Sequence, residues 1–206
     1  SPRVGIYCGQ GVTAGHLWHF YPLEQCGMDV VFLTAADLPR LQGIDVITFP
    51  SGGSYQKFIS QNGITRLRQL IREQGLGFLG TCGGNVFGSH LQLLPADLMK
   101  ASDGRSYGIP INGHPRMRVT RPGHPAMVSA GDVIRPFYFW GQAYRQVGDG
   151  AQILAVYQDL EDTFSFFGRP YDGHEGPTTV GRPGIIAGTC GRGRIILSGP
   201  HPEVGQ

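Results

Sequence analysis

A cysteine within a glycine-rich segment is the residue of this chain with the clearest potential for chemistry. Cys82 is the central residue of the segment 80–84, Gly-Thr-Cys-Gly-Gly, which directly follows the apolar residues Phe78 and Leu79. This is the G-x-nucleophile-x-G spacing of a tight turn from a buried strand into a helix, with cysteine in place of serine. Such a turn holds the side chain above the sheet, at a helix N-terminus that favours a thiolate. The spacing predicts that Cys82 is a nucleophile, and the alternative is a buried structural cysteine.

A histidine with a carboxylate two residues away forms a second candidate group. Residues 199–203 read Gly-Pro-His-Pro-Glu, and Pro202 favours an extended conformation for His201. Residues i and i+2 of an extended segment project to the same side, so Glu203 can reach one ring nitrogen of His201. The other nitrogen can then act on a nucleophile. Cys82, His201 and Glu203 are therefore the candidate catalytic residues.

The remaining histidines and cysteines show no pattern typical of a metal or redox site. The four cysteines are widely spaced and contain no C-x-x-C pair, although one or two disulfides would suit an exported protein. The other histidines are scattered over segments rich in glycine and proline, where solvent exposure is favoured. We expect no metal and no cofactor. The histidines expected to be exposed are His16, His19, His114, His124 and His174.

Alternating strands and helices are expected to position the candidate residues. Short segments rich in β-branched and apolar residues predict strands, and apolar side chains at helical spacing predict helices near residues 17–21 and 64–71. Pro22 is expected to break or kink the first of these helices. The alternation predicts an α/β fold with a parallel sheet and helices on both faces. The expected strands are residues 3–7, 29–33, 45–49 and 77–79.

The ends of three predicted strands carry the candidate site residues. Cys8 follows the first strand, Gly52 and Gly53 follow the third, and Cys82 follows the fourth. Ligands of parallel α/β sheets bind at the carboxyl ends of the strands. We therefore expect these four residues to converge.

From residue 90 to about residue 150 the pattern changes to turns and short strands. We expect an antiparallel excursion that covers the site, within a single domain of residues 1–206. Residues 159–184 are rich in glycine, proline and polar residues, and a loop of this length is uncommon enough to suggest a lid. The expected strands in this half are residues 116–119, 137–140, 153–157, 185–187 and 194–198.

Composition indicates one globular protein with a small-molecule substrate or ligand. A chain of 206 residues with 40% hydrophobic and 16% charged residues can bury one substantial core. A formal net charge of +2 is too small to indicate nucleic-acid binding, and no apolar stretch approaches the roughly 20 residues that span a membrane. The first residue is Ser1, so we expect that a start methionine or a signal peptide was removed; a cytoplasmic location is favoured.

Taken together, these motifs resemble those of the class I glutamine amidotransferases. A closer resemblance, over nearly the whole chain, is to the amidotransferase-like domain at the N-terminus of eukaryotic biotin–protein ligases, which also occurs as a free-standing bacterial protein. The resemblance implies a flavodoxin-like α/β fold with Cys82, His201 and Glu203 as a catalytic triad. It also implies an oxyanion hole formed by the backbone N–H groups of Gly83 and of Gly52 or Gly53. The residues that carry the closer resemblance are 7–12, 49–53, 78–84, 138–141 and 191–203.

The chain departs from the glutaminase pattern at two positions. Val86 stands where those enzymes usually have a glutamine four residues after the nucleophile, and Ser51 is inserted before the glycines of the strand-end turn. The favoured function is a cysteine hydrolase or amidase acting on a small amide or ester, and the main alternative is a non-catalytic binding or regulatory module. A redox or glyoxalase-like role is less favoured because the related group carries an acidic residue where this chain has Gln10. Biotin ligation by this chain alone is the least favoured function.

Overall fold

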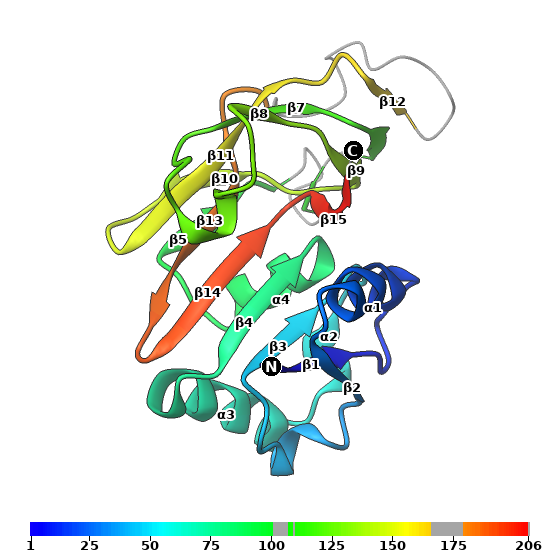
Figure 1. Ribbon diagram of the computed structural model, residues 1–206, viewed down its shortest axis with the longest axis vertical. Coiled ribbons are helices and arrows are strands. Elements are labelled where there is room, and N and C mark those ends of the chain that lie inside the picture. The colour runs from blue at the N-terminus through cyan, green and yellow to red at the C-terminus, as the bar shows by residue number, and fades with distance from the viewer. Residues whose placement is uncertain (101–106, 109, 166–178, 206) are drawn as a thin grey trace. The chain divides into compact units, whose positions relative to one another are not determined.

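The computed structural model describes residues 1–100, 107–108, 110–165 and 179–205 (Figure 1). These residues group into two compact units. The first unit contains residues 1–94 and 188–197, and the second contains the described residues of 95–187 and 198–205. The expectation of a single domain over residues 1–206 stays a prediction.

The first unit is built on parallel strands in the order β2-β1-β3-β4, with β14 next to β4. Strand β1 pairs in parallel with both β2 and β3, and β3 pairs in parallel with β4. This arrangement confirms the predicted α/β class with a parallel sheet. The strands are β1 (Arg3–Tyr7), β2 (Asp29–Leu33), β3 (Val46–Phe49), β4 (Gly77–Thr81) and β14 (Gly193–Ser198).

Helical segments cover both faces of these strands. The ring of Phe32 on β2 packs against Phe20 of α1, with 5.4 Å between ring centroids. Successive residues of a strand project to opposite faces, so Leu33 lies on the other face, beside the segment of residues 36–44. The helical segments are α1 (Gly15–Gln25), the 3₁₀ helix η1 (Leu38–Arg40), α2 (Tyr55–Phe58), α3 (Gln61–Gln69), the π-helix η2 (Leu70–Gln74) and α4 (Gly83–His90).

Helix α1 is not broken at Pro22, where a break or a kink was expected. The helix continues to Gln25. A proline lacks an N–H group and its ring crowds the carbonyl of residue i−4, but its own carbonyl oxygen still accepts a hydrogen bond from the N–H of Cys26 at 3.0 Å. The last turn therefore closes without the proline N–H.

Large aromatic side chains form the core beneath the predicted site of the first unit. The rings of Tyr7 and Phe49 stack at a centroid distance of 4.8 Å, and Phe49 contacts Phe87 of α4 at 4.7 Å. Tyr55 packs edge-on against Phe49 at 5.4 Å. All four residues are buried, and aromatic pairs of this kind add about 0.5–1.5 kcal/mol beyond the burial of their surface. Closely packed aromatic side chains therefore support the ends of β1 and β3.

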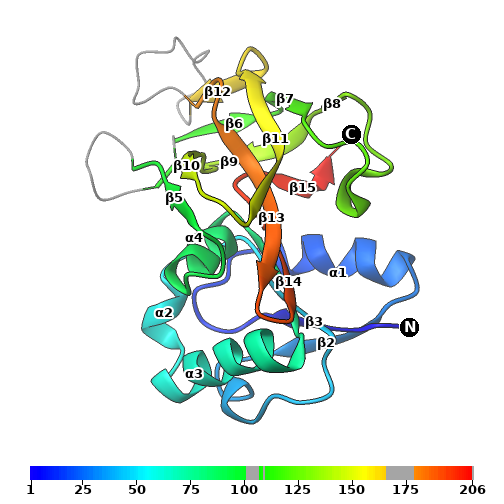
Figure 2. The same ribbon diagram turned by 90° about the vertical axis from the view of Figure 1, so that its left-hand side faces the viewer.

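The second unit contains the predicted antiparallel excursion (Figure 2). Strand β11 pairs antiparallel with β7, and β7 with β8. A separate sheet has the order β12-β6-β9-β15. The strands of this half are β5 (Ala96–Leu98), β6 (Ile111–Gly113), β7 (Arg116–Val119), β8 (Val133–Ile134), β9 (Pro136–Phe139), β10 (Tyr144–Val147), β11 (Ala151–Asp159), β12 (Thr163–Ser165), β13 (Pro183–Cys190) and β15 (His201–Gly205), with the 3₁₀ helix η3 (Pro125–Met127). Residues 188–190 of β13 belong to the first unit.

The predicted loop of residues 159–184 is interrupted by regular structure. Strand β12 lies within it and pairs antiparallel with β6, while residues 166–178 lie outside the described part of the chain. The predicted hairpin is present, with β13 and β14 as neighbouring strands. In the described ranges, no helix is long and apolar enough to cross a membrane.

Candidate functional site

Cys82 lies at a sharp turn between a strand and a helix of the first unit. Strand β4 ends at Thr81 and α4 begins at Gly83, and between them Cys82 has φ +50° and ψ −109°. A residue other than glycine with positive φ pays on the order of 1–3 kcal/mol, and such strain persists only where the surrounding structure enforces it. The N–H of Val86 donates to the Cys82 carbonyl oxygen at 3.2 Å. Cys82 is therefore held at the start of α4.

Glycines allow this turn to pack tightly against the end of β3. A Cβ atom on Gly84 would overlap the carbonyl oxygen of Phe49 and lie 2.6 Å from its carbonyl carbon. The N–H of Gly84 donates to the Pro50 carbonyl oxygen at 3.1 Å. A side chain at position 84 would force these two backbones apart, so the glycine is required by the close approach.

The turn that follows β3 lies directly against the first residue of α4. A Cβ atom on Gly83 would overlap the Gly52 carbonyl oxygen and lie 2.8 Å from the Gly52 nitrogen. The Tyr55 hydroxyl lies 2.8 Å from the Pro50 carbonyl oxygen and 3.2 Å from that of Ser51, and it donates to this pair. Burial, and then the negative charges that Cys82 and Tyr7 can carry, raise the pKa of Tyr55 far above its usual value. Tyr55 therefore stays protonated, and its hydroxyl hydrogen bonds hold the turn after β3 in place.

The backbone N–H groups of the two glycines in this turn differ in their partners. The N–H of Gly53 donates to the Gly11 carbonyl oxygen at 2.9 Å, beside the bridge between Val12 and Gly52. Within the described residues, the N–H of Gly52 forms no hydrogen bond. Gly52 is therefore the glycine of the turn whose N–H can serve a ligand.

The second unit holds the histidine and the glutamate. Oε1 of Glu203 lies 2.8 Å from Nδ1 of His201, so the carboxylate can accept a hydrogen bond from the ring. His201 of β15 lies opposite Phe137 of β9 in the antiparallel strand pair, and the centroids of the two rings are 6.1 Å apart. His201 is buried, and the bond to Glu203 sets the orientation of its imidazole.

The predicted site residues thus form two groups, one in each unit. The first unit brings together Cys82, Gly83 and Gly52, while the second pairs His201 with Glu203.

His19 corrects the expectation that the other histidines are exposed. It is 2% exposed, and its Nε2 lies 2.9 Å from Oγ1 of Thr81, the residue before Cys82. His16, His114 and His124 are partly exposed, and residue 174 lies outside the described part of the chain. The sequence carried no signal for this burial, because Leu17 and Tyr21, two of the apolar residues that predicted the helix, are exposed.

The cysteines are all free thiols in different environments. Cys8 is half-buried at the end of β1, where burial and then the negative charge of Asp37 raise its pKa. Cys26 is exposed, whereas Cys82 and Cys190 are buried. In the described ranges, no three histidine, cysteine, aspartate or glutamate side chains are grouped to hold a metal.

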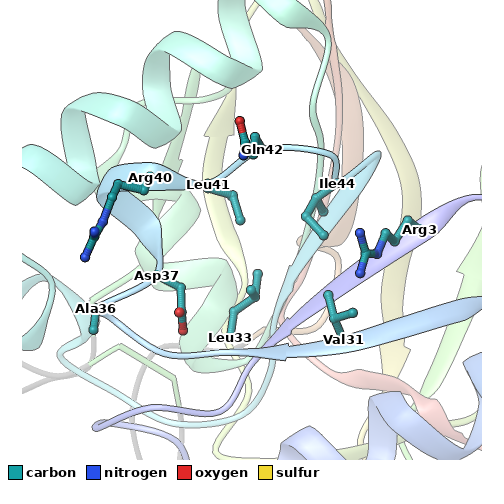
Figure 3. Close-up of a pocket in the computed structure, with 9 residues that line it drawn as sticks. All are labelled: Arg3, Val31, Leu33, Ala36, Asp37, Arg40, Leu41, Gln42 and Ile44. Atoms are coloured by element: carbon teal, nitrogen blue, oxygen red, sulfur yellow. The ribbon is translucent and has the colours of Figure 1, made fainter.

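A hollow of about 330 Å³ lies elsewhere in the first unit, beside β1, β2 and residues 36–44 (Figure 3). Figure 3 shows Arg3 and Asp37 on opposite sides of it. Nε of Arg3 pairs with Asp29 at 3.2 Å, and the Asp37 carboxylate accepts hydrogen bonds from the N–H and hydroxyl of Thr34. The Thr34 N–H and then its hydroxyl lower the pKa of Asp37. These charges are thus engaged within the chain, and none of the predicted site residues lines the hollow.

Comparison with solved structures identifies the class of fold. PurLQS from Thermotoga maritima is 18% identical, with a TM-score of 0.68, and the match covers 98% of this chain and 88% of that one. A glutamine amidotransferase is 16% identical, with a TM-score of 0.62 and coverage of 97% and 90%. A glutamine amidotransferase from Thermotoga maritima is 14% identical, with a TM-score of 0.61 and coverage of 98% and 76%. No family model matches the sequence, and no curated protein matches it. The chain has the fold of the glutamine amidotransferases.

Proposed function

We propose that the protein is a cysteine-dependent hydrolase or amidase that acts on a small amide or ester. The observation that carries this proposal is the backbone of Cys82, held at φ +50° at the start of α4 and beside the turn that contains Gly52. A structural cysteine would not require this strained conformation, whereas a nucleophile gains from it by projecting toward a substrate. The amidotransferase fold supports the same assignment.

In the proposed reaction, the Cys82 sulfur forms a bond with the substrate carbonyl carbon. The carbonyl electron pair moves to the oxygen, which accepts hydrogen bonds from the N–H groups of Gly83 and Gly52. Collapse of this intermediate breaks the bond to the amine or alcohol and leaves an acyl-cysteine, which water then hydrolyses.

His201 and Glu203 are assigned the proton transfers of this reaction. Glu203 engages Nδ1 of His201, so Nε2 is the ring atom assigned to accept the proton of the Cys82 thiol. The same atom would deliver that proton to the leaving group and then activate water. The motif resemblance further supports a relative of the N-terminal domain of biotin–protein ligases.

We expect Cys82 to be the most reactive thiol toward limiting iodoacetamide at mildly acidic pH. An ordinary thiol, with a pKa of about 8.5, is then almost fully protonated, whereas a thiol at a helix N-terminus beside an imidazolium is reactive. Its rate should exceed that of Cys8 by at least about tenfold, because Cys8 does not begin a helix and has a raised pKa. Mass-spectrometric mapping of the four cysteines over time measures this.

The matched controls are Cys82→Ala and Cys8→Ala. Cys82→Ala should lose the fast phase of labelling, and Cys8→Ala should keep it. Faster modification of Cys8, Cys26 or Cys190 than of Cys82 would sink the proposal. A panel of small esters and amides then separates the two main functions, because an enzyme releases product repeatedly and a binding module stops at one acyl group per chain.

We expect little or no hydrolysis of free glutamine. Val86 lies one turn after Cys82 in α4, where the related enzymes have a glutamine, and its side chain can neither donate nor accept a hydrogen bond. Losing a hydrogen bond to a charged substrate group costs about 1.5–3 kcal/mol, or about one to two decades in rate. Glutamate release from millimolar-range glutamine, with Cys82→Ala as the blank, measures this. Robust Cys82-dependent release would contradict the prediction.

A further inference from the structure

We propose that His19 and Thr81 form a positioning pair that holds Cys82 in its reactive conformation. This inference rests on the proposed function, because it assigns a role in supporting the Cys82 nucleophile. It adds a buried histidine that belongs to neither the proposed triad nor the oxyanion hole.

The pair joins two segments that are 62 residues apart in the sequence. Nε2 of His19 lies 2.9 Å from Oγ1 of Thr81, and the two residues are 2% and 1% exposed. Thr81 is the last residue of β4 and is bonded directly to Cys82. The hydrogen bond therefore fixes the residue from which the strained turn departs, in an environment where water does not compete.

Helix α1 supports both segments that surround Cys82. Gly15 and His19 are four residues apart and lie on one face of the helix, and they are its buried residues. A Cβ atom on Gly15 would lie 2.7 Å from the Ser51 nitrogen, so the helix backbone rests on the turn after β3. One turn later, His19 reaches Thr81 at the end of β4. The same face of α1 thus holds the turn with Gly52 and the strand end before Cys82.

The positive φ of Cys82 makes this support necessary. A strained residue relaxes into an ordinary backbone region unless its neighbours hold it. The close approach of Gly84 to Phe49 restrains the turn after Cys82, and the bond between His19 and Thr81 restrains the strand before it. Without the second restraint, we expect the Cys82 sulfur to spend less time at the start of α4 and to react more slowly.

Two single variants, their double variant and a conservative control test the pair. Thr81→Val removes the hydroxyl while nearly keeping the side-chain shape, and His19→Leu removes the ring nitrogen. Each should slow iodoacetamide labelling of Cys82 by about three- to tenfold, the range for one hydrogen bond. The double variant should be no slower than the slower single variant, because both changes break the same bond. Thr81→Ser keeps the hydroxyl and should label within about twofold of the wild type.

Labelling of Cys190 in the same samples separates positioning from loss of structure. Cys190 is buried in the first unit, outside the proposed site. General loosening would accelerate labelling of Cys82 and Cys190 together, whereas loss of positioning slows Cys82 and leaves Cys190 protected. Unchanged Cys82 labelling in Thr81→Val, equal slowing in Thr81→Ser, or acceleration at both cysteines would overturn the pair. The proposed function is tested separately, by whether Cys82 is the most reactive thiol of the wild type.

Discussion

Replacing Gly84 with alanine is expected to lower the free energy of unfolding by about 2–3 kcal/mol, the upper part of the range for overpacking. The new Cβ would overlap the Phe49 carbonyl oxygen and lie 2.6 Å from the carbonyl carbon and 2.9 Å from the Phe49 Cβ. Two of these three atoms belong to the backbone of β3 and cannot rotate away. The helix propensity of alanine returns only about 1 kcal/mol. Urea unfolding followed by circular dichroism measures the difference.

Gly53→Ala is the matched control. A Cβ atom on Gly53 would meet no atom within 4 Å, its φ is not positive, and alanine keeps the N–H that donates to Gly11. The free energy of unfolding should change by less than about 0.5 kcal/mol. A Gly84→Ala variant as stable as Gly53→Ala would mean that β3 and α4 approach less closely than described.

Replacing His201 with alanine is expected to slow labelling of Cys82 at mildly acidic pH by about tenfold or more, because the proposed triad assigns His201 to Cys82 and an imidazolium there would favour the thiolate. Once a hydrolysed substrate is found, the rate of turnover should fall by at least about 100-fold, as typical for loss of a general base. Timed mapping of the Cys82 adduct and product release measure the two effects.

His114→Ala provides the control for His201→Ala within the same unit. The ring of His114 also packs against Phe137, with 5.6 Å between centroids, but His114 has no role in the proposed reaction. This variant should label Cys82 at close to the wild-type rate. Equal rates in the wild type and His201→Ala would show that His201 does not act on Cys82, and the proposed triad would then be wrong.

Local sequence patterns were sufficient where neighbouring residues decide the structure. Residues 3–7 and 29–33 form strands as predicted, because runs of β-branched and apolar side chains suit a buried sheet. The turn at Cys82 follows from the flanking glycines, which allow a close approach that side chains would block. His201 and Glu203 meet because residues i and i+2 of an extended segment share a side. In each case the controlling geometry spans only a few residues.

Only the tertiary structure decided which groups lie around Cys82 in the first unit. The burial of His19 depends on Thr81, which is 62 residues away, and helical spacing alone does not reveal the partner of a polar side chain. From the sequence, Gly52 and Gly53 were equally good candidates for the oxyanion hole. In the structure they differ, because the N–H of Gly53 donates to the Gly11 carbonyl oxygen. Contacts between distant segments decide which backbone hydrogen bonds form and which buried polar groups become partners. The local sequence of one segment does not indicate which other segment it will contact.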